Sequence, residues 1–111
     1  MGRFVKGDVV VVPFPFTDLS EAKRRPAFVV ASLPGEDCIL CQITSQQVRD
    51  AAAIALLDED FEQGGLRQPS RIRPNRLFTA NARLILYTAG RATRAKTTEV
   101  IESIVKLLRS G

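Results

Sequence analysis

Short hydrophobic runs separated by turn-forming residues make up most of the chain before residue 90. These runs occupy residues 4–16, 26–32, 38–44, 53–57, 70–78 and 84–88. Their length and their content of β-branched residues predict short strands. Glycines mark turns at Gly64, Gly65 and Gly90, and the polar segment 17–25 predicts a loop before the second strand. Pro74 interrupts the run at 70–78, because proline cannot donate a ladder hydrogen bond.

The period of the hydrophobic positions changes near the C-terminus. Apolar residues recur at helical spacing at Val100, Ile101, Ile104, Val105, Leu107 and Leu108. This pattern predicts one amphipathic α-helix, with Thr97 or Thr98 as its N-terminal cap and Gly111 at its end. The strands follow one another too closely for a parallel βαβ fold. We therefore expect a mainly β protein of one domain over residues 1–111, a small barrel or bent antiparallel sheet with a C-terminal α-helix packed on it.

The composition removes several kinds of active site. The chain contains no histidine, which excludes imidazole catalysis, histidine-ligated metals and Ser-His-Asp triads. Its two cysteines, Cys38 and Cys41, have the C-x-x-C spacing of a zinc or redox pair. Residues three apart in a strand face opposite ways, however, and two thiolates alone do not complete a tetrahedral site. We therefore expect two reduced, buried cysteines and no metal or cofactor.

Positive charge is concentrated in the second half of the chain. The net charge is +4, and 12 of the 16 basic residues are arginine. Residues 1–59 sum to −2, whereas residues 60–111 sum to +6. Arginine binds phosphate through paired hydrogen bonds, so this distribution favours an anionic partner.

The apolar runs are too short for a membrane protein. None approaches the roughly 20 residues that span a bilayer, and no apolar signal-peptide core follows the start. We therefore expect a cytoplasmic protein that has no contact with membranes.

Three polar clusters at predicted strand ends are candidates for binding a phosphate or a base. They are Lys-Arg-Arg at 23–25, Thr-Ser-Gln-Gln at 44–47 and the arginines within 70–78. If the last segment is extended, Arg71 and Arg73 share one of its faces. Each cluster also has an ordinary structural explanation: a solvated loop end, turn hydrogen bonds, and salt bridges to the acidic residues 58–60. The residues alone leave both explanations open.

Five segments occur in an order and spacing that resemble one toxin family along nearly the whole chain. They are GDVVVVPFPFTD (7–18), KRRPAFVV (23–30), ILCQITSQ (39–46), GGL (64–66) and RPNRLFT (73–79). The chain thus resembles the MazF/PemK toxins of type II toxin–antitoxin systems, especially the PemK-like growth inhibitors. The resemblance implies an SH3-like barrel and a sequence-specific, metal-independent endoribonuclease that inhibits translation and growth. In such enzymes the ribose 2′-OH of single-stranded RNA attacks the adjacent phosphorus, which leaves 2′,3′-cyclic phosphate and 5′-OH ends.

The resemblance also implies roles for individual residues. The family's Arg-Pro arginine corresponds to Arg25, which would bind the scissile phosphate and stabilise its developing charge. The family's strand-end hydroxyl corresponds to Thr44, which would hydrogen-bond a non-bridging oxygen. Glu21 is the candidate proton acceptor for the 2′-OH, with Asp18 as an alternative. Some relatives carry a carboxylate where this chain has Asn75, and an amide cannot accept a proton in that role. The expected RNA contacts are Arg24, Ser45, Gln46, Arg73 and Asn75.

Partners and alternative functions follow from the same resemblance. It implies single-stranded RNA, an acidic MazE- or PemI-like antitoxin and a second copy of the chain as partners. A homodimer would also cover the exposed edges of a small sheet. Two other functions stay open, because fold alone does not fix activity: a CcdB-like inhibitor of DNA gyrase and a catalytically decayed RNA-binding module. Asn75 keeps the second open, whereas the R-P-A and I-T-S-Q segments argue against the first.

Overall fold

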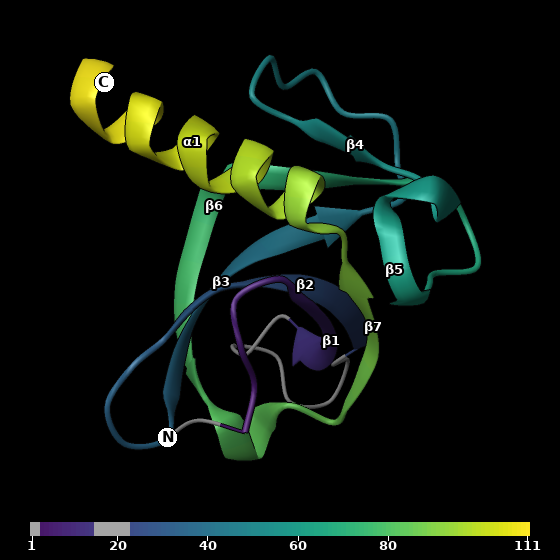
Figure 1. Ribbon diagram of the computed structural model, residues 1–111, viewed down its shortest axis with the longest axis vertical. Helices are drawn as coiled ribbons and strands as arrows, with labels where there is room; N and C mark the ends of the chain where they lie inside the picture. Colours follow the sequence, from purple (N-terminus) through teal and green to yellow (C-terminus); the bar gives the residue numbers. More distant parts are fainter. Residues whose placement is uncertain (1–2, 15–22) are drawn as a thin grey trace.

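The computed structural model describes residues 3–14 and 23–111, which form a curled sheet followed by a helix (Figure 1). The strands are β1 (Asp8–Phe14), β2 (Lys23–Ser32), β3 (Asp37–Thr44), β4 (Ile54–Leu56), β5 (Phe61–Gly64), β6 (Ser70–Asn81) and β7 (Tyr87–Ala92). Two 3₁₀ turns, η1 (Asp58–Asp60) and η2 (Ala82–Leu84), connect strands, and α1 (Arg94–Ser110) follows β7. The two candidate proton acceptors, Glu21 and Asp18, lie outside the described residues.

Antiparallel pairing joins the seven strands into one sheet in the order β4-β6-β3-β2-β1-β7-β5. The register shifts within several of these ladders, for example between Val9 and Val10 and between Cys41 and Gln42. Such bulges bend a strand and increase its twist, which lets a single sheet curl into a half-barrel. The predicted fold class, mainly β with a C-terminal helix, is confirmed.

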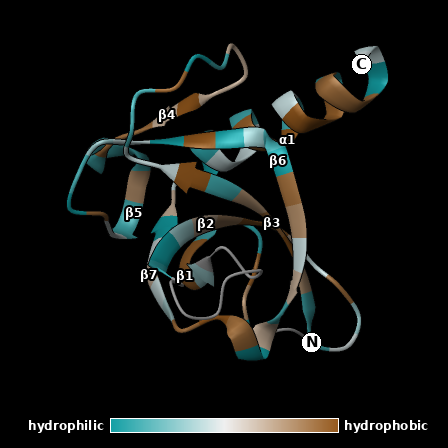
Figure 2. Ribbon diagram, turned by 180° about the vertical axis from the view of Figure 1, so that it is seen from behind, coloured by the Kyte–Doolittle hydropathy of each residue, from teal (hydrophilic) through white to brown (hydrophobic). Residues whose placement is uncertain are grey.

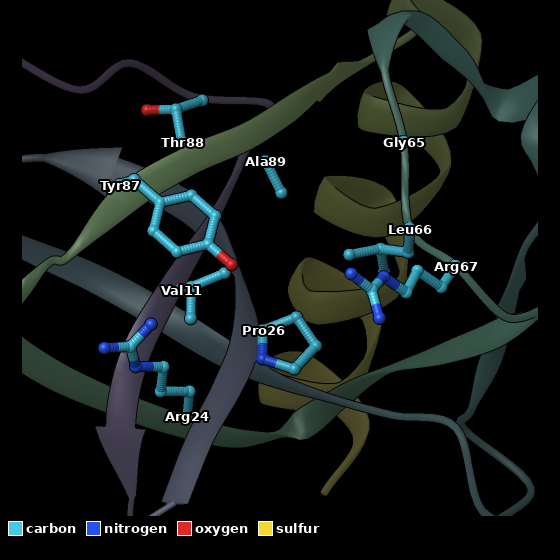
Figure 3. A pocket seen from close by; sticks show the side chains of 9 residues that line it. All are labelled: Val11, Arg24, Pro26, Gly65, Leu66, Arg67, Tyr87, Thr88 and Ala89. Carbon is cyan, nitrogen blue, oxygen red and sulfur yellow. The ribbon is translucent and has the colours of Figure 1, made fainter.

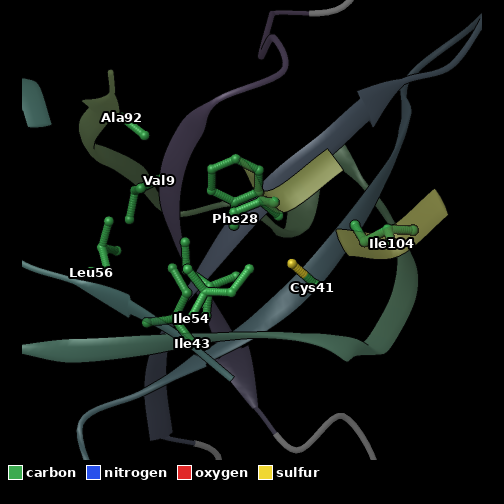
Figure 4. Close-up of a cluster of buried hydrophobic side chains, with 10 residues drawn as sticks. Val9, Phe28, Cys41, Ile43, Ile54, Leu56, Ala92 and Ile104 are labelled. Carbon is green, nitrogen blue, oxygen red and sulfur yellow. The ribbon is translucent and has the colours of Figure 1, made fainter. Parts of the chain in front are cut away.

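Successive residues of the central strands point to opposite faces, and each face is covered by its own hydrophobic cluster. Val9 and Phe28 belong to a first cluster that includes Val100 and Ile104 of α1 (Figure 4). Val10 and its neighbours on the other face belong to a second cluster, with Ala27, Val29, Leu40, Ala80 and Ile85 among its members. These central strands are therefore apolar on both faces and read as nearly continuous hydrophobic runs.

Several boundaries differ from the sequence-based expectations. The second strand begins at Lys23 rather than residue 26, so the basic triplet lies within a strand and not at a loop end. The last strand covers Tyr87–Ala92 instead of residues 84–88. A further strand, β5, ends at Gly64, where the pattern predicts only a turn. The helix begins earlier than predicted, because Thr93 caps it by accepting a hydrogen bond from the Lys96 N–H at 3.1 Å.

The helix α1 carries two apolar stripes, and only one of them is fully packed. Val100 and Ile104 are buried, whereas Val105 and Leu108 are 37% and 70% exposed. Figures 1 and 2 show that the C-terminal turns of α1 extend beyond β6, with hydrophobic residues among the hydrophilic ones. The predicted packing of the helix on the sheet is confirmed, and part of its apolar surface near the C-terminus remains exposed. No helix in the described parts of the chain is long and apolar enough to cross a membrane.

Candidate active site

The ends of β2 and β3 bring Arg25 and Thr44 to the same face of the sheet. Ala27 of β2 pairs with Gln42 of β3, and extending this antiparallel register by two residues puts Arg25 opposite Thr44. Arg25 also pairs with Val12 of β1 on its other side. Because side chains alternate along a strand, Arg25 and Thr44 lie on the face of the second hydrophobic cluster, beyond its last apolar residues.

Strand β6 adds two arginines to this face. Thr44 pairs with Arg71, and Gln42 pairs with Arg73. Thr44 therefore lies between Arg25 on one neighbouring strand and Arg71 on the other. The expectation that Arg71 and Arg73 share a face is confirmed by this register. Arg71 is not among the contacts expected from the sequence, although its spacing from Arg73 is the signal that could have found it.

The Thr44 hydroxyl is held in a defined position at the strand end. The residue is only 7% exposed, and its Oγ1 accepts a hydrogen bond from the Gln46 N–H at 3.1 Å. This is the side-chain turn expected for such a segment, and it leaves the hydroxyl hydrogen available to a ligand oxygen. Ser45 and Gln46 are exposed beside it. The turn explanation and a binding role are therefore compatible at this strand end.

Arg73 forms a largely buried ion pair, although with a different partner from the one expected. Its Nε donates to Oδ2 of Asp50 at 3.0 Å, and the two side chains are 17% and 7% exposed. The expected bridges to the acidic residues 58–60 are not made by Arg73, and Asp60 instead lies 3.8 Å from Nζ of Lys96. Nothing in the sequence pattern links Asp50 to Arg73, which is 23 residues away.

Asp50 is a carboxylate held in its charged form near the predicted site. Burial alone would raise its pKa, but hydrogen bonds from Arg73, the Ala52 N–H and the Asn75 side chain outweigh burial and lower the pKa. A carboxylate with a lowered pKa and occupied oxygens is a weak proton acceptor. Asp50 therefore fixes Arg73 and is unsuited to act as a general base.

Two other predicted contact residues lie elsewhere. Arg24 precedes Arg25 on β2 and so projects from the opposite face of the sheet. Asn75 is exposed and lies in the stretch of β6 between Arg73 and Leu77, where the register with β3 shifts. The structure thus groups Arg25, Thr44 and Arg73, places Asn75 against Asp50, and separates Arg24 from them.

The cysteines are not part of this cluster. Both are buried and unpaired, as the sequence predicts, and they belong to different hydrophobic clusters. Burial raises the pKa of Cys41 to about 12, which keeps its thiol protonated. Among the described residues, no group of three or more histidine, cysteine or acidic side chains is placed to hold a metal ion.

The combination of guanidinium groups and a fixed hydroxyl is suited to a phosphate group. Arginine offers several N–H donors in a rigid plane that match phosphate oxygens, and the Thr44 hydroxyl offers one more donor. Asp50 neutralises one of the three arginines on this face, which leaves Arg25 and Arg71 to attract an anion. This end of the sheet is therefore a candidate phosphate site.

The sequence profile of one known family matches most of the chain. Residues 5–108 match the sequence profile of a family described as the PemK-like, MazF-like toxin of type II toxin–antitoxin systems. No curated protein sequence matches the chain.

Solved structures with the same fold cover nearly the whole chain. An endoribonuclease in complex with its cognate antitoxin, from a mycobacterial species, is 15% identical, with 97% of each chain covered and a TM-score of 0.72. A MazE–MazF structure from Deinococcus radiodurans is 18% identical, with 97% of this chain and 98% of that chain covered and a TM-score of 0.73. The Mycobacterium tuberculosis toxin MazF-mt6 is 16% identical, with 92% and 96% covered and a TM-score of 0.68.

Proposed function

Because this chain belongs to the PemK-like, MazF-like toxins of type II toxin–antitoxin systems, we propose that it is a sequence-specific endoribonuclease that cuts single-stranded RNA. The observation that carries the proposal is the strand register: Thr44 pairs with Arg71 on β6, and the β2–β3 register, continued by two residues, puts Arg25 on its other side. The similar structures described as endoribonucleases support it further. The protein acts in the cytoplasm, where it inhibits translation and growth.

The reaction uses the RNA's own 2′-OH as the nucleophile, and we propose that it proceeds without a metal or other cofactor. The 2′-oxygen forms a bond to the adjacent phosphorus while the bond from phosphorus to the 5′-oxygen breaks. The 2′-OH gives up its proton to a base, and the 5′-oxygen gains one. Arg25 and Thr44 hold the non-bridging oxygens and stabilise the charge that develops on them.

Glu21 is our candidate for the base that accepts the 2′-OH proton. Within the described residues, Asp50 is excluded by its ion pair, and an arginine guanidinium offers N–H donors but no acceptor for a proton. Arg73, Ser45, Gln46 and Asn75 contact the RNA around the scissile phosphate.

Two protein partners are part of the proposal. An acidic, MazE- or PemI-like antitoxin neutralises the toxin by covering the basic end of the sheet, in keeping with the antitoxin complexes among the similar structures. A second copy of the chain forms a homodimer. The exposed apolar stripe at Val105 and Leu108 supports such an association, because exposed hydrophobic patches commonly mark interaction surfaces.

Cleavage of a mixed-sequence single-stranded RNA in EDTA tests the proposal. The wild-type protein should give discrete cuts with 2′,3′-cyclic phosphate ends, and a 2′-deoxy nucleotide 5′ to the scissile phosphate should abolish the cut. Arg25→Ala should lower kcat by about 100-fold or more, as removal of a charge-stabilising donor does in other active sites. Arg83→Ala is the matched control, because its side chain is 79% exposed and η2 follows the end of β6 that pairs with Asp37, away from Thr44; this variant should keep full activity.

Three results would contradict the proposal. Equal cleavage by Arg25→Ala would show that Arg25 is not in the active site. Inhibition of DNA gyrase with RNA left intact would favour the gyrase-inhibitor alternative. RNA binding without cleavage over a broad pH range would favour the decayed module.

A further inference from the structure

A cleft with two arginines in its lining lies on the face of the sheet opposite Arg25 and Thr44. It has a volume of about 400 Å³, and Figure 3 shows the side chains that line it. Val11 and Pro26 form its floor, Leu66 forms one wall, and Arg24, Arg67 and Tyr87 surround its opening. This volume lies within the range of small-ligand sites.

Strand pairing explains how these residues meet. Val11 of β1 pairs with Pro26 of β2 on one side and with Tyr87 of β7 on the other, so all three share a face. Arg24 lies two residues before Pro26 and projects from the same face. Arg67 and Leu66 come from the segment that follows β5. Leu66 also packs against the first hydrophobic cluster, which anchors this side of the cleft.

The lining combines an aromatic ring, an apolar floor and two positive charges. Tyr87 is 51% exposed despite its size, and it lines the same cleft as Arg24 (Figure 3). Within residues 3–14 and 23–111, neither Arg24 nor Arg67 forms a salt bridge with a carboxylate. Exposed aromatic rings together with cationic side chains are the features by which proteins hold single-stranded nucleic acids, since the ring stacks on a base and the cations bind phosphates.

The floor of the cleft offers no free strand edge to an extended peptide. Peptides that add a strand need a free sheet edge, but β1, β2 and β7 each pair with a neighbour on both sides. The floor is therefore a closed sheet face, and a ligand on it is held by side chains and by the backbone of Gly65 in the wall. The apolar floor and the Tyr87 ring suit a planar base, and Arg24 and Arg67 suit its phosphate.

We propose that this cleft binds one nucleotide of a single-stranded RNA, outside the scissile position, while Arg25 and Thr44 hold the scissile phosphate. The inference rests on the proposed function and extends its substrate-binding surface to the second face of the sheet. Arg24 and Arg25 are neighbours at the start of β2 and project to opposite faces. An RNA strand that passes around this strand end contacts both.

Binding of a non-cleavable RNA tests this inference without relying on catalysis. The probe is a fluorescent, fully 2′-O-methylated 12-nucleotide RNA of mixed sequence, and anisotropy gives its Kd with the full-length protein. Tyr87→Leu should raise Kd by about 5- to 100-fold, the range for loss of one stacked base, whereas Tyr87→Phe should bind as the wild type does. Arg67→Ala should weaken binding and reduce the slope of log K against log salt by about 0.7, the loss of one phosphate contact. Arg83→Ala is again the control and should change neither quantity.

A second measurement separates this cleft from the active site. With a cleavable RNA of the same length, Tyr87→Leu and Arg67→Ala should raise KM and leave kcat within about twofold of the wild type, because they remove binding that ground state and transition state share. Unchanged Kd and KM in both variants would overturn the inference even if the protein is a ribonuclease. Weaker binding in both variants would sustain the inference even if no cleavage occurs. Variants that bind RNA normally but fail to bind the antitoxin would overturn it in favour of a protein-binding cleft.

Discussion

The buried ion pair of Asp50 and Arg73 predicts a large loss of stability when Asp50 is replaced by asparagine. The Arg73 Nε lies 3.0 Å from the carboxylate, and neither side chain is more than 17% exposed. Asparagine keeps the shape and the acceptor for the Ala52 N–H, but it leaves the guanidinium without its counter-charge. Removing one partner of a buried pair costs about 3–5 kcal/mol. Because Arg73 keeps some contact with water, we expect Asp50→Asn to lower the free energy of unfolding by about 3 kcal/mol.

The effect depends on pH in a direction that follows from the lowered pKa of Asp50. A carboxyl group whose pKa is lower in the folded state than in the unfolded state stabilises the fold wherever it is ionised in both. This stabilisation is complete above the unfolded pKa of about 3.9 and disappears as the pH falls through the lower, folded pKa. The difference in stability between the wild type and Asp50→Asn should therefore be full at pH 7 and shrink below about pH 4.

Urea denaturation at a fixed protein concentration measures this difference at pH 7 and at pH 3. A double-mutant cycle with Arg73→Leu isolates the interaction between the two side chains. We expect a coupling free energy of about 2 kcal/mol at pH 7, in the range measured for residues in one salt-bridge network. Additive effects of the two substitutions, or a difference that is as large at pH 3 as at pH 7, would refute the assigned ion pair.

Two further predictions concern the scaffold. Gly64 has a φ of +68°, and a Cβ there would lie 2.3 Å from the backbone oxygen of Ala89. Gly64→Ala should therefore lower the free energy of unfolding, measured by urea denaturation, by about 2 kcal/mol or more. Gly65→Ala is the matched control and should change stability little, since nothing lies within 4 Å of its Cβ position; an equal loss in both variants would contradict the clash. Cys41 is buried and its pKa is raised to about 12, so its thiol should not react with iodoacetamide at pH 8 while the protein is folded. Mass spectrometry that detects alkylated Cys41 in the folded protein would contradict its burial.

The sequence predicted the central strands well and the outer ones poorly, for a physical reason. Strands β1, β2 and β3 are buried on both faces, so each appears in the sequence as a continuous hydrophobic run that can be recognised without knowing how the strands pair. The edge strand β5 carries only Phe61 as an apolar residue, and its pairing with β7 gives no sequence signal. Gly90 is predicted to end the last strand but lies inside it. A Cβ at Gly90 would lie 2.7 Å from the Gln63 backbone oxygen, so this glycine serves the close approach of β5.

The first residue of the helix could not be predicted from the sequence either. Three threonines, Thr93, Thr97 and Thr98, precede the apolar stripe, and each is an acceptable cap by residue type. Tertiary contacts determine which threonine is the cap. The Ala92 N–H donates to the Gly7 carbonyl, and the Thr93 N–H donates to the Asp60 carbonyl. These bonds end β7 directly before Arg94 and leave Thr93 as the cap.

Part of the candidate site could be predicted from local sequence segments, and the rest depends on how distant strands pair. Arg25 and Thr44 can be chosen from their segments, but the arginine that flanks Thr44 on β6 depends on an irregularity at Pro74. If β6 continued the register that pairs Cys41 with Leu77, Thr44 would face Pro74. The register instead shifts by three residues, so that Gln42 pairs with Arg73 and Thr44 with Arg71. Proline cannot donate to the ladder, which explains why the shift occurs at this residue. A visible break in the sequence pattern thus determines which cations surround Thr44, although its size and direction follow only from the folded sheet.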